Sequence, residues 1–247
     1  PEPTKPPSSG EVNQQSDRGR GDVLVNTEEV ADSGATMFVA DYSTVATDTY
    51  QSTLAGRDQW MVRGEKYPPR ERTKAPFAPW NQAAKWGEEE NRAGFATAKE
   101  WNDTDPRSDG LVFIQLETDP FAFVDGDDVR DPETGEVHPA FRAILQHLGA
   151  TYTDVSTSGT GAHAYYRAEA GLPIDGKNEA TFQIDTEPWG ANDSPPTVEI
   201  YANKHVNITT GDHVADTPLD LADWNDDALR AILEANGFSD KEAVSHD

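Results

Sequence analysis

Apolar residues gather in short runs between about residue 57 and the C-terminal end of the chain. Most of these runs are rich in β-branched and aromatic residues and are bounded by turn-forming residues, a pattern typical of strands. We predict strands, in chain order, at residues 59–63, 74–77, 111–116, 121–128, 152–156, 162–167, 197–201 and 205–210. Only a short turn separates the third of these strands from the fourth, so we expect the two to form a hairpin.

A different period, with apolar residues three and four apart, predicts helices. The strongest such pattern covers residues 139–148, where Pro139 suits the first helical position and Gly149 suits the position after the end. A second amphipathic helix is predicted at residues 226–236, and a shorter one at residues 95–101. These helices are too few to alternate with the strands, which argues against a doubly wound fold.

The order of elements predicts an α+β fold with a mostly antiparallel sheet and flanking helices. Residues 1–50 are rich in Pro, Ser, Gly, Gln and charge, and we expect a flexible acidic or polar tail or linker there. The folded domain is placed at residues 51–216, with a solvated insertion at 169–195. Residues 217–247 are expected to form a C-terminal helix and a linker towards a further domain.

The charge of the chain is unusual. The 247 residues include 45 Asp and Glu against 20 Lys and Arg, a formal net charge of −25, and 35% of them are hydrophobic. Such numbers are compatible with disorder, but six Trp, seven Tyr and nine Phe within patterned segments favour a packed core. An acidic surface with Arg preferred over Lys resembles proteins of salt-accumulating halophiles, since molar salt shortens the Debye length to about 3 Å. A protein that mimics DNA is the alternative.

Composition also excludes several classes of chemistry. The chain has no cysteine, which excludes disulfides, thiol catalysis and cysteine-ligated metals. Its apolar runs fall short of the roughly 18 residues that a membrane span needs, so we expect no membrane partner and a cytoplasmic location. The chain begins with Pro1 rather than Met, and we expect it to be a fragment or a processed product.

The strand predicted at residues 121–128 ends in carboxylates. Alternate side chains of a strand share a face, so Asp125 and Asp127 should point the same way. A buried carboxylate is costly unless it is paired or bound to a metal. These two residues therefore predict a divalent-cation site, while an ordinary acidic turn at the end of a strand is the alternative.

Other residues with chemical potential follow downstream. A glycine-rich loop, residues 158–161, leads to His163, and a single acidic residue, Glu199, interrupts an apolar strand. Lys204 follows in a tight turn. Each has an ordinary explanation, respectively a strand connection, a structural histidine, a wet sheet face and a solvated turn charge. Their combination and order are more specific than any one of them.

The stretch from residue 57 to residue 216 resembles the primase–polymerase domain of the archaeo-eukaryotic primase superfamily, in particular its plasmid and viral branch of bifunctional DNA primase/polymerases (prim-pol). Its first motif, an apolar strand ending in D-x-D, matches residues 123–127. A Ser- and Gly-rich turn leading to His matches residues 157–163, and an acidic residue in a strand matches residues 198–201. The chain departs from the family at Gly126, where an apolar residue is usual.

This resemblance implies a prim-pol catalytic core with an RNA-recognition-motif-like (RRM-like) element, and residue roles within it. Two Mg²⁺ or Mn²⁺ ions would be held by Asp125, Asp127 and Glu199. These carboxylates and His163 would form the catalytic set. The triphosphate of a dNTP or NTP would bind residues Ser158, Gly159, Gly161, His163 and Lys204. Asp128 and Asp154 are candidates for supporting groups around these ligands.

The implied activity is template-directed nucleotidyl transfer, that is, DNA primase and DNA polymerase activity in the replication of a haloarchaeal replicon, virus or plasmid. The partners would be a DNA template and primer, with a helicase domain in the full-length protein. A cluster of basic residues is a candidate template contact, although solvated turn charges are the more usual explanation of such a cluster: Arg57, Arg63, Lys66, Arg70, Arg72 and Lys74. The alternatives are a metal-dependent nuclease and a non-catalytic nucleic-acid-binding module of replication initiation.

Overall fold

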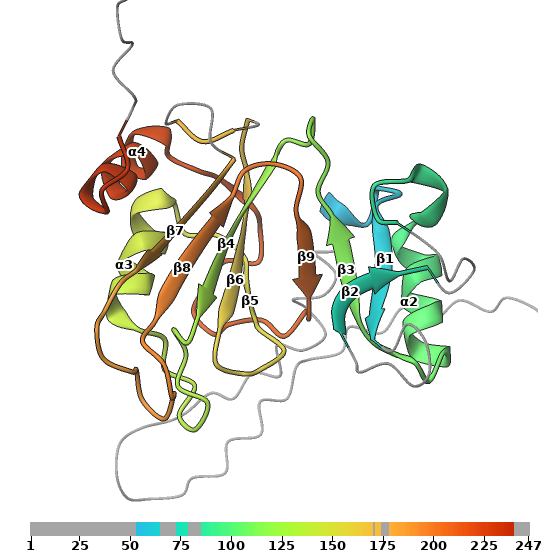
Figure 1. Ribbon diagram of the computed structural model, residues 1–247, viewed down its shortest axis with the longest axis horizontal. Helices are drawn as coiled ribbons and strands as arrows, with labels where there is room; N and C mark the ends of the chain where they lie inside the picture. The colour runs from blue at the N-terminus through green and yellow to red at the C-terminus, as the bar shows by residue number, and fades with distance from the viewer. Residues whose placement is uncertain (1–52, 65–72, 79–84, 170, 174–177, 240–247) are drawn as a thin grey trace, which may run out of the picture. The chain divides into compact units, whose positions relative to one another are not determined.

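The computed structural model describes residues 53–64, 73–78, 85–169, 171–173 and 178–239, with the side chains of 73–75 left out. All of these residues belong to one compact unit, residues 40–247. The tail predicted at residues 1–50 lies outside the described residues. Within them the fold is α+β with mostly antiparallel sheets, as the order of elements predicts (Figure 1).

The larger of two sheets carries the predicted site. In the described part of the chain it has six strands in the order β10-β6-β4-β8-β7, with β5 paired to β6. Strand β10 runs parallel to β6, and the other pairs are antiparallel. The strands are β4 (Phe121–Asp127), β5 (Thr153–Val155), β6 (Ala162–Arg167), β7 (Glu179–Gln183), β8 (Thr197–Tyr201) and β10 (Ala222–Asp223).

The smaller sheet has the strand order β2-β1-β3-β9 and is antiparallel throughout its described pairs. Its strands are β1 (Trp60–Gly64), β2 (Thr73–Phe77), β3 (Ser108–Ile114) and β9 (Val206–Thr209). The hairpin predicted between β3 and β4 is therefore wrong. Both edges of β3 are already paired, one with β1 and the other with β9, so β4 has no edge of β3 to join.

The segment between β3 and β4 connects the smaller sheet to the larger one. Asp119 is buried and accepts a hydrogen bond from the backbone N–H of Leu116 at 2.7 Å, which closes the turn. The side-chain amide of Gln115 donates to the carbonyl of Phe121 at 2.6 Å, at the first residue of β4. Buried polar groups of a crossing chain must find such partners, because the sheets do not supply them.

Two helices cover one face of the larger sheet (Figure 1). They are α3 (Pro139–Leu148) and α4 (Asp226–Ala235), and α3 has the bounds that its apolar spacing predicts. His138 accepts from the backbone N–H of Ala140 at 3.2 Å as the N-cap of α3, and Asn225 caps α4 in the same way. Their apolar faces pack on the even-numbered side chains of β4 and on β6 and β8.

The opposite face of the larger sheet meets the smaller sheet through aromatic side chains. Phe113 of β3 lies 5.3 Å from Trp60 and 6.0 Å from Phe121 between ring centroids, both edge to face. Phe123 meets Tyr165 of β6 in the same manner at 5.1 Å. Helix α2 (Phe95–Thr104) packs behind the smaller sheet, and a short 3₁₀ helix, Glu89–Asn91, precedes it. Of these contacts, the one between Phe113 and Phe121 joins the two sheets.

Residues 169–195 contain more structure than the solvated insertion predicted there. Strand β7 lies in this segment and pairs with β8, and its residues Ala180 and Phe182 are buried in the main core. Further along the chain, Trp224, Leu229 and Leu233 are buried in the same core, so the described part of 217–247 packs on the domain. In the part of the chain that the structure covers, no helix is both long and apolar enough to cross a membrane.

Candidate functional site

Three of the predicted residues form a row across adjacent strands. Asp125 of β4 lies directly opposite His163 of β6 on one side and Glu199 of β8 on the other. Asp127 follows two residues later and shares their face of the sheet, because side chains alternate along a strand. Residues directly opposite in an antiparallel pair have Cβ atoms about 4.5–5.5 Å apart. Sheet register alone thus brings together residues that are far apart in the sequence.

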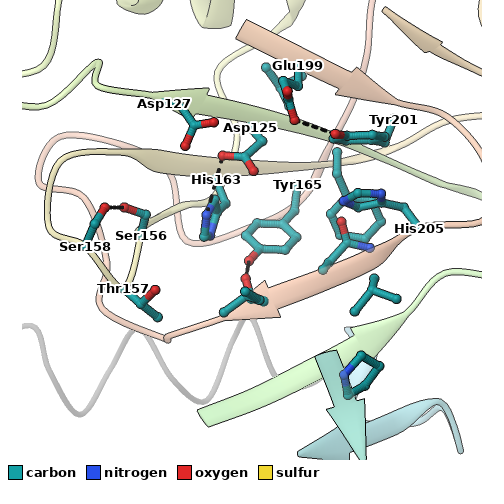
Figure 2. A pocket seen from close by; sticks show the side chains of 16 residues that line it. Asp125, Asp127, Ser156, Thr157, Ser158, His163, Tyr165, Glu199, Tyr201 and His205 are labelled. Atoms are coloured by element: carbon teal, nitrogen blue, oxygen red, sulfur yellow. Dashed lines mark hydrogen bonds and ion pairs between the residues drawn. The ribbon is translucent and has the colours of Figure 1, made fainter. Parts of the chain in front are cut away.

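All four residues line one cavity of about 380 Å³. Its charged half also includes residues 156–158, where the glycine-rich loop begins. Its other half is formed by aromatic, aliphatic and amide side chains (Figure 2). This second half contains Pro76, Phe123, Tyr165, Tyr201, His205, Val206, Asn207 and Ile208. The cavity therefore has a charged half on the ends of β4, β6 and β8 and a neutral half against β9.

His163 sits between two carboxylates. Its Nδ1 lies 3.1 Å from Oδ1 of Asp154, and its Nε2 lies 3.5 Å from Oδ1 of Asp125. Burial alone lowers the pKa of His163. The hydrogen bond to Asp154 and the negative charge of that residue outweigh burial, and the charges of Asp125 and Asp127 add to them, so the pKa is raised. The imidazolium form is thereby favoured at the centre of the site.

Asp154 is fully buried and holds this histidine in place. Its Oδ2 accepts hydrogen bonds from the backbone N–H groups of Thr210 at 2.9 Å and Gly211 at 3.1 Å. The hydroxyl of Tyr165 donates to the same carboxylate at 3.1 Å. A buried carboxylate needs such donors, and these hydrogen bonds fix the position of the carboxylate that contacts His163. Asp128, the other supporting candidate, is not among the residues that line the cavity.

Glu199 is turned towards Tyr201, whose hydroxyl donates to its Oε2 (Figure 2). The ring of Tyr201 stacks on that of His205, with centroids 3.4 Å apart and planes 15° from parallel. Burial, followed by the hydrogen bond and charge of Glu199, raises the pKa of Tyr201. Burial and the nearby His163 lower the pKa of His205 to about 4, so both rings are neutral near pH 7. Neither residue was singled out from the sequence, although Tyr201 shares a strand face with Glu199.

The glycine-rich loop is held by its own hydroxyls and by an arginine. Ser156 Oγ accepts from the backbone N–H of Gly161 at 2.9 Å and lies 2.8 Å from the hydroxyl of Ser158. The guanidinium of Arg130 donates to the carbonyl of Gly159 at 2.7 Å. Gly159 has φ 79°, a left-handed conformation that suits glycine. The loop is thus fixed beside the end of β4, where Arg130 follows the predicted metal ligands.

Gly126, the departure from the family pattern, fits its surroundings. It points to the helix-covered face, where an added Cβ would lie 2.7 Å from Val129 and 2.8 Å from the ring of Phe141. On the neighbouring strand, a Cβ on Gly161 would come within 2.5 Å of the Gly126 carbonyl oxygen. Phe141 occupies the space that a larger side chain would need. The strand that carries the two aspartates is therefore closely packed at this glycine.

Lys204 lies apart from the other predicted residues. It has φ 43°, its ammonium pairs with Glu117 at 2.6 Å, and it is not among the residues that line the cavity. Gly159 and Gly161 are likewise absent from that lining, whereas Ser158 is part of it. The Glu117–Lys204 pair instead links two segments, one leading from β3 to β4 and the other from β8 to β9.

The predicted basic cluster is described only in part. Arg57 pairs with Asp119 at 3.4 Å, and Arg63 pairs with Asp109 at 3.3 Å. Lys66, Arg70 and Arg72 lie outside the described residues, as does the side chain of Lys74. The two arginines that are described therefore have acidic partners within the domain.

The carboxylates offer the right donor atoms for a hard cation, although their side chains are not gathered around one point. Among the described residues, no group of three or more His, Asp or Glu side chains is arranged to hold a metal ion. Asp125, Asp127 and Glu199 share a face and a cavity, and carboxylate oxygens are what Mg²⁺ prefers. The Glu199 carboxylate is held by Tyr201 instead of facing Asp125. The donor atoms are of the kind that a divalent cation prefers, but the structure does not bring the three carboxylates around one point.

Comparison with known proteins gives no family assignment: no protein-family model matches the chain, and no curated protein matches it.

Proposed function

We propose that this protein is a nucleotidyltransferase that joins nucleotides on a DNA template, with the catalytic core of a primase–polymerase. The observation that carries the proposal is the row formed by Asp125, His163 and Glu199 on three adjacent strands, with Asp127 beside it, in one cavity. A reaction between a sugar hydroxyl and the α-phosphate of a nucleoside triphosphate needs acidic and cationic groups side by side. This row supplies both within one cavity.

In this proposal the carboxylates of Asp125, Asp127 and Glu199 hold Mg²⁺ or Mn²⁺. Divalent ions bound there would polarise the phosphoryl oxygens and stabilise the attacking and leaving oxygens of an in-line displacement. The side chain of Asp125 is 30% exposed, while its Oδ1, which faces His163, is buried. Without a metal ion, the carboxylate of Glu199 accepts a hydrogen bond from Tyr201. Binding of a metal ion would break this hydrogen bond.

His163 and the loop would bind the triphosphate. A protonated imidazole attracts an anion, and Asp154 favours that protonated form while fixing the ring. Ser158 adds a hydroxyl at the cavity wall, and Arg130 steadies the loop from behind. The same acidic residues would serve a metal-dependent nuclease, but a cation placed beside a hydroxyl-rich loop suits a bound triphosphate better.

The acidic surface makes DNA binding unusual for such an enzyme. Counterion release contributes little at molar salt, so contacts to a template and primer would rest on metal bridging, stacking and backbone hydrogen bonds. This balance of forces fits replication of a haloarchaeal replicon, virus or plasmid. A non-catalytic replication module has no need of acidic and cationic side chains gathered in one cavity, so catalysis is the simpler explanation.

Extension of a labelled primer tests the proposal. The assay uses a DNA template, dNTPs or NTPs, and Mn²⁺ or Mg²⁺ in concentrated potassium chloride. The Asp125→Asn/Asp127→Asn variant should lose roughly a thousandfold in rate, because metal-assisted catalysis is worth several kcal/mol. Asp128→Asn is the matched control, since it removes a neighbouring carboxylate outside the cavity lining, at φ 54°, which asparagine tolerates.

Equal extension by the wild type and the Asp125→Asn/Asp127→Asn variant would remove the basis for the site. Degradation of the primer without extension would replace the proposed activity with nuclease activity. Loss of extension in Asp128→Asn as large as in the double variant would show that general acidity, and not this site, matters.

A further inference from the structure

The neutral half of the cavity contains a buried polar group that the proposed chemistry does not use. Asn207 of β9 is only 6% exposed and lines the cavity, yet its Nδ2 has no hydrogen-bond partner among the described residues. Leaving a buried donor unsatisfied is costly, because the group has lost its hydrogen bonds to water without gaining others. Because Asn207 lines the cavity, a ligand bound there could supply the missing acceptor.

The surroundings of Asn207 restrict what that ligand is. The walls nearby are aromatic or aliphatic, formed by Phe123, Tyr165 and the stacked pair of Tyr201 and His205. The stacked pair presents flat ring surfaces beside the amide of Asn207. A flat or ring-shaped neutral body with an oxygen acceptor would fit both these walls and the amide.

The two halves of the cavity together match one class of molecule. The charged half, with its carboxylates and His163, suits a metal-bound polyphosphate. The neutral half suits an uncharged ring system that carries oxygen acceptors. We propose that the Asn207 side chain recognises the nucleoside part of the bound nucleotide. Its Nδ2 would donate a hydrogen bond to an oxygen of the sugar or the base. This inference rests on the proposed function, because it takes the ligand to be a nucleoside triphosphate.

The test compares two nucleotides, which share a phosphate chain and differ in the base, with a phosphate chain that carries no nucleoside. Binding of dCTP, dATP and inorganic tripolyphosphate is measured by calorimetry with Mn²⁺ in concentrated potassium chloride. Asn207→Leu keeps the approximate shape and removes the donor, so it should weaken binding of dCTP about tenfold, the usual effect of one lost hydrogen bond to a ligand. Affinity for tripolyphosphate should stay within about twofold of the wild type, which also shows that the variant is folded.

Asn207→Ala serves as the second variant in case leucine does not fit the strand. A similar loss for dCTP and dATP assigns the acceptor to the sugar, which both share, and a loss confined to dCTP assigns it to a base carbonyl. Unchanged nucleotide affinity in the folded variants overturns the inference, as does equal weakening of tripolyphosphate. Wild-type protein that binds nucleotide through Asn207 but never extends a primer would instead overturn the proposed function alone.

Discussion

The two faces of β4 differ in what packs against them. The even-numbered residues Ala122, Val124 and Gly126 face helices α3 and α4 in a continuous apolar core. On the other face, Phe121 and Phe123 pack on the smaller sheet, while Asp125 and Asp127 reach the cavity. All residues of the first face pack in the core. On the second face, buried aromatic residues are followed within a few positions by carboxylates that line the cavity. The proposed site therefore begins where, along the strand, the covering sheet stops.

The largest effect on stability is expected from the packed face. Phe141 of α3 is fully buried against β4, so Phe141→Ala should lower the free energy of unfolding by about 3–5 kcal/mol through lost burial and a cavity. Urea titration at fixed potassium chloride concentration measures this change. The matched control is Phe95→Ala, at a partly buried ring of α2, which should cost distinctly less. Equal losses would mean that the helix-covered face is not the main source of stability.

A substitution at Gly126 tests how closely β4 packs against helix α3. Gly126→Ala adds a methyl group that would lie 2.7 Å from Val129, so an overpacking loss of about 1–3 kcal/mol is expected. Gly56→Ala is the control, since a Cβ there meets nothing within 4 Å. Thermal unfolding of both variants decides the matter. A Gly126→Ala protein as stable as Gly56→Ala would show that the helix α3 shifts freely away from β4.

The smallest effect concerns the charged face and appears as a pH dependence. Asp154 helps to raise the pKa of His163 in the folded protein, so protonated His163 stabilises the fold below the unfolded pKa of about 6.5. That contribution is lost as the pH rises through the raised folded pKa. In Asp154→Asn the pKa of His163 should fall, and this part of the pH dependence should shrink. Titration of the imidazole by NMR measures the shift, and an unchanged pKa would contradict the role given to Asp154.

The sequence predicts the positions of most elements because their signals are local. The apolar period, Pro139 and Gly149 suffice for α3, whose bounds agree with the structure. Pairing partners are not local, which is why the expected β3–β4 hairpin is wrong: β9 arrives from far along the chain to take the free edge of β3. The sequence did not predict strand β7, because it lies in a polar segment and only two of its residues, Ala180 and Phe182, are buried in the core.

The candidate site was predictable to a similar extent. Asp125, His163 and Glu199 belong to motifs with a recognisable order, and the sheet register brings them together. The neutral half of the cavity has no such motif. Three residues of this half are recognised only from the structure, through a ring stack, a hydrogen bond and a buried amide: Tyr201, His205 and Asn207. The spacing of residues in the sequence does not predict these contacts. Lys204, chosen by resemblance, lies on a turn and pairs with Glu117.

The crossing of the chain between the two sheets has a consequence for how the protein folds. Strand β9 pairs with β3 through contacts such as Leu111 with Thr209, which join residues distant in sequence. Contacts of this kind form slowly, since a long loop must close before they can form. We therefore expect the smaller sheet to be completed late, after the larger sheet has brought β8 into place. Asn207 would then be among the last cavity residues to reach its position, and the neutral half would assemble after the charged one.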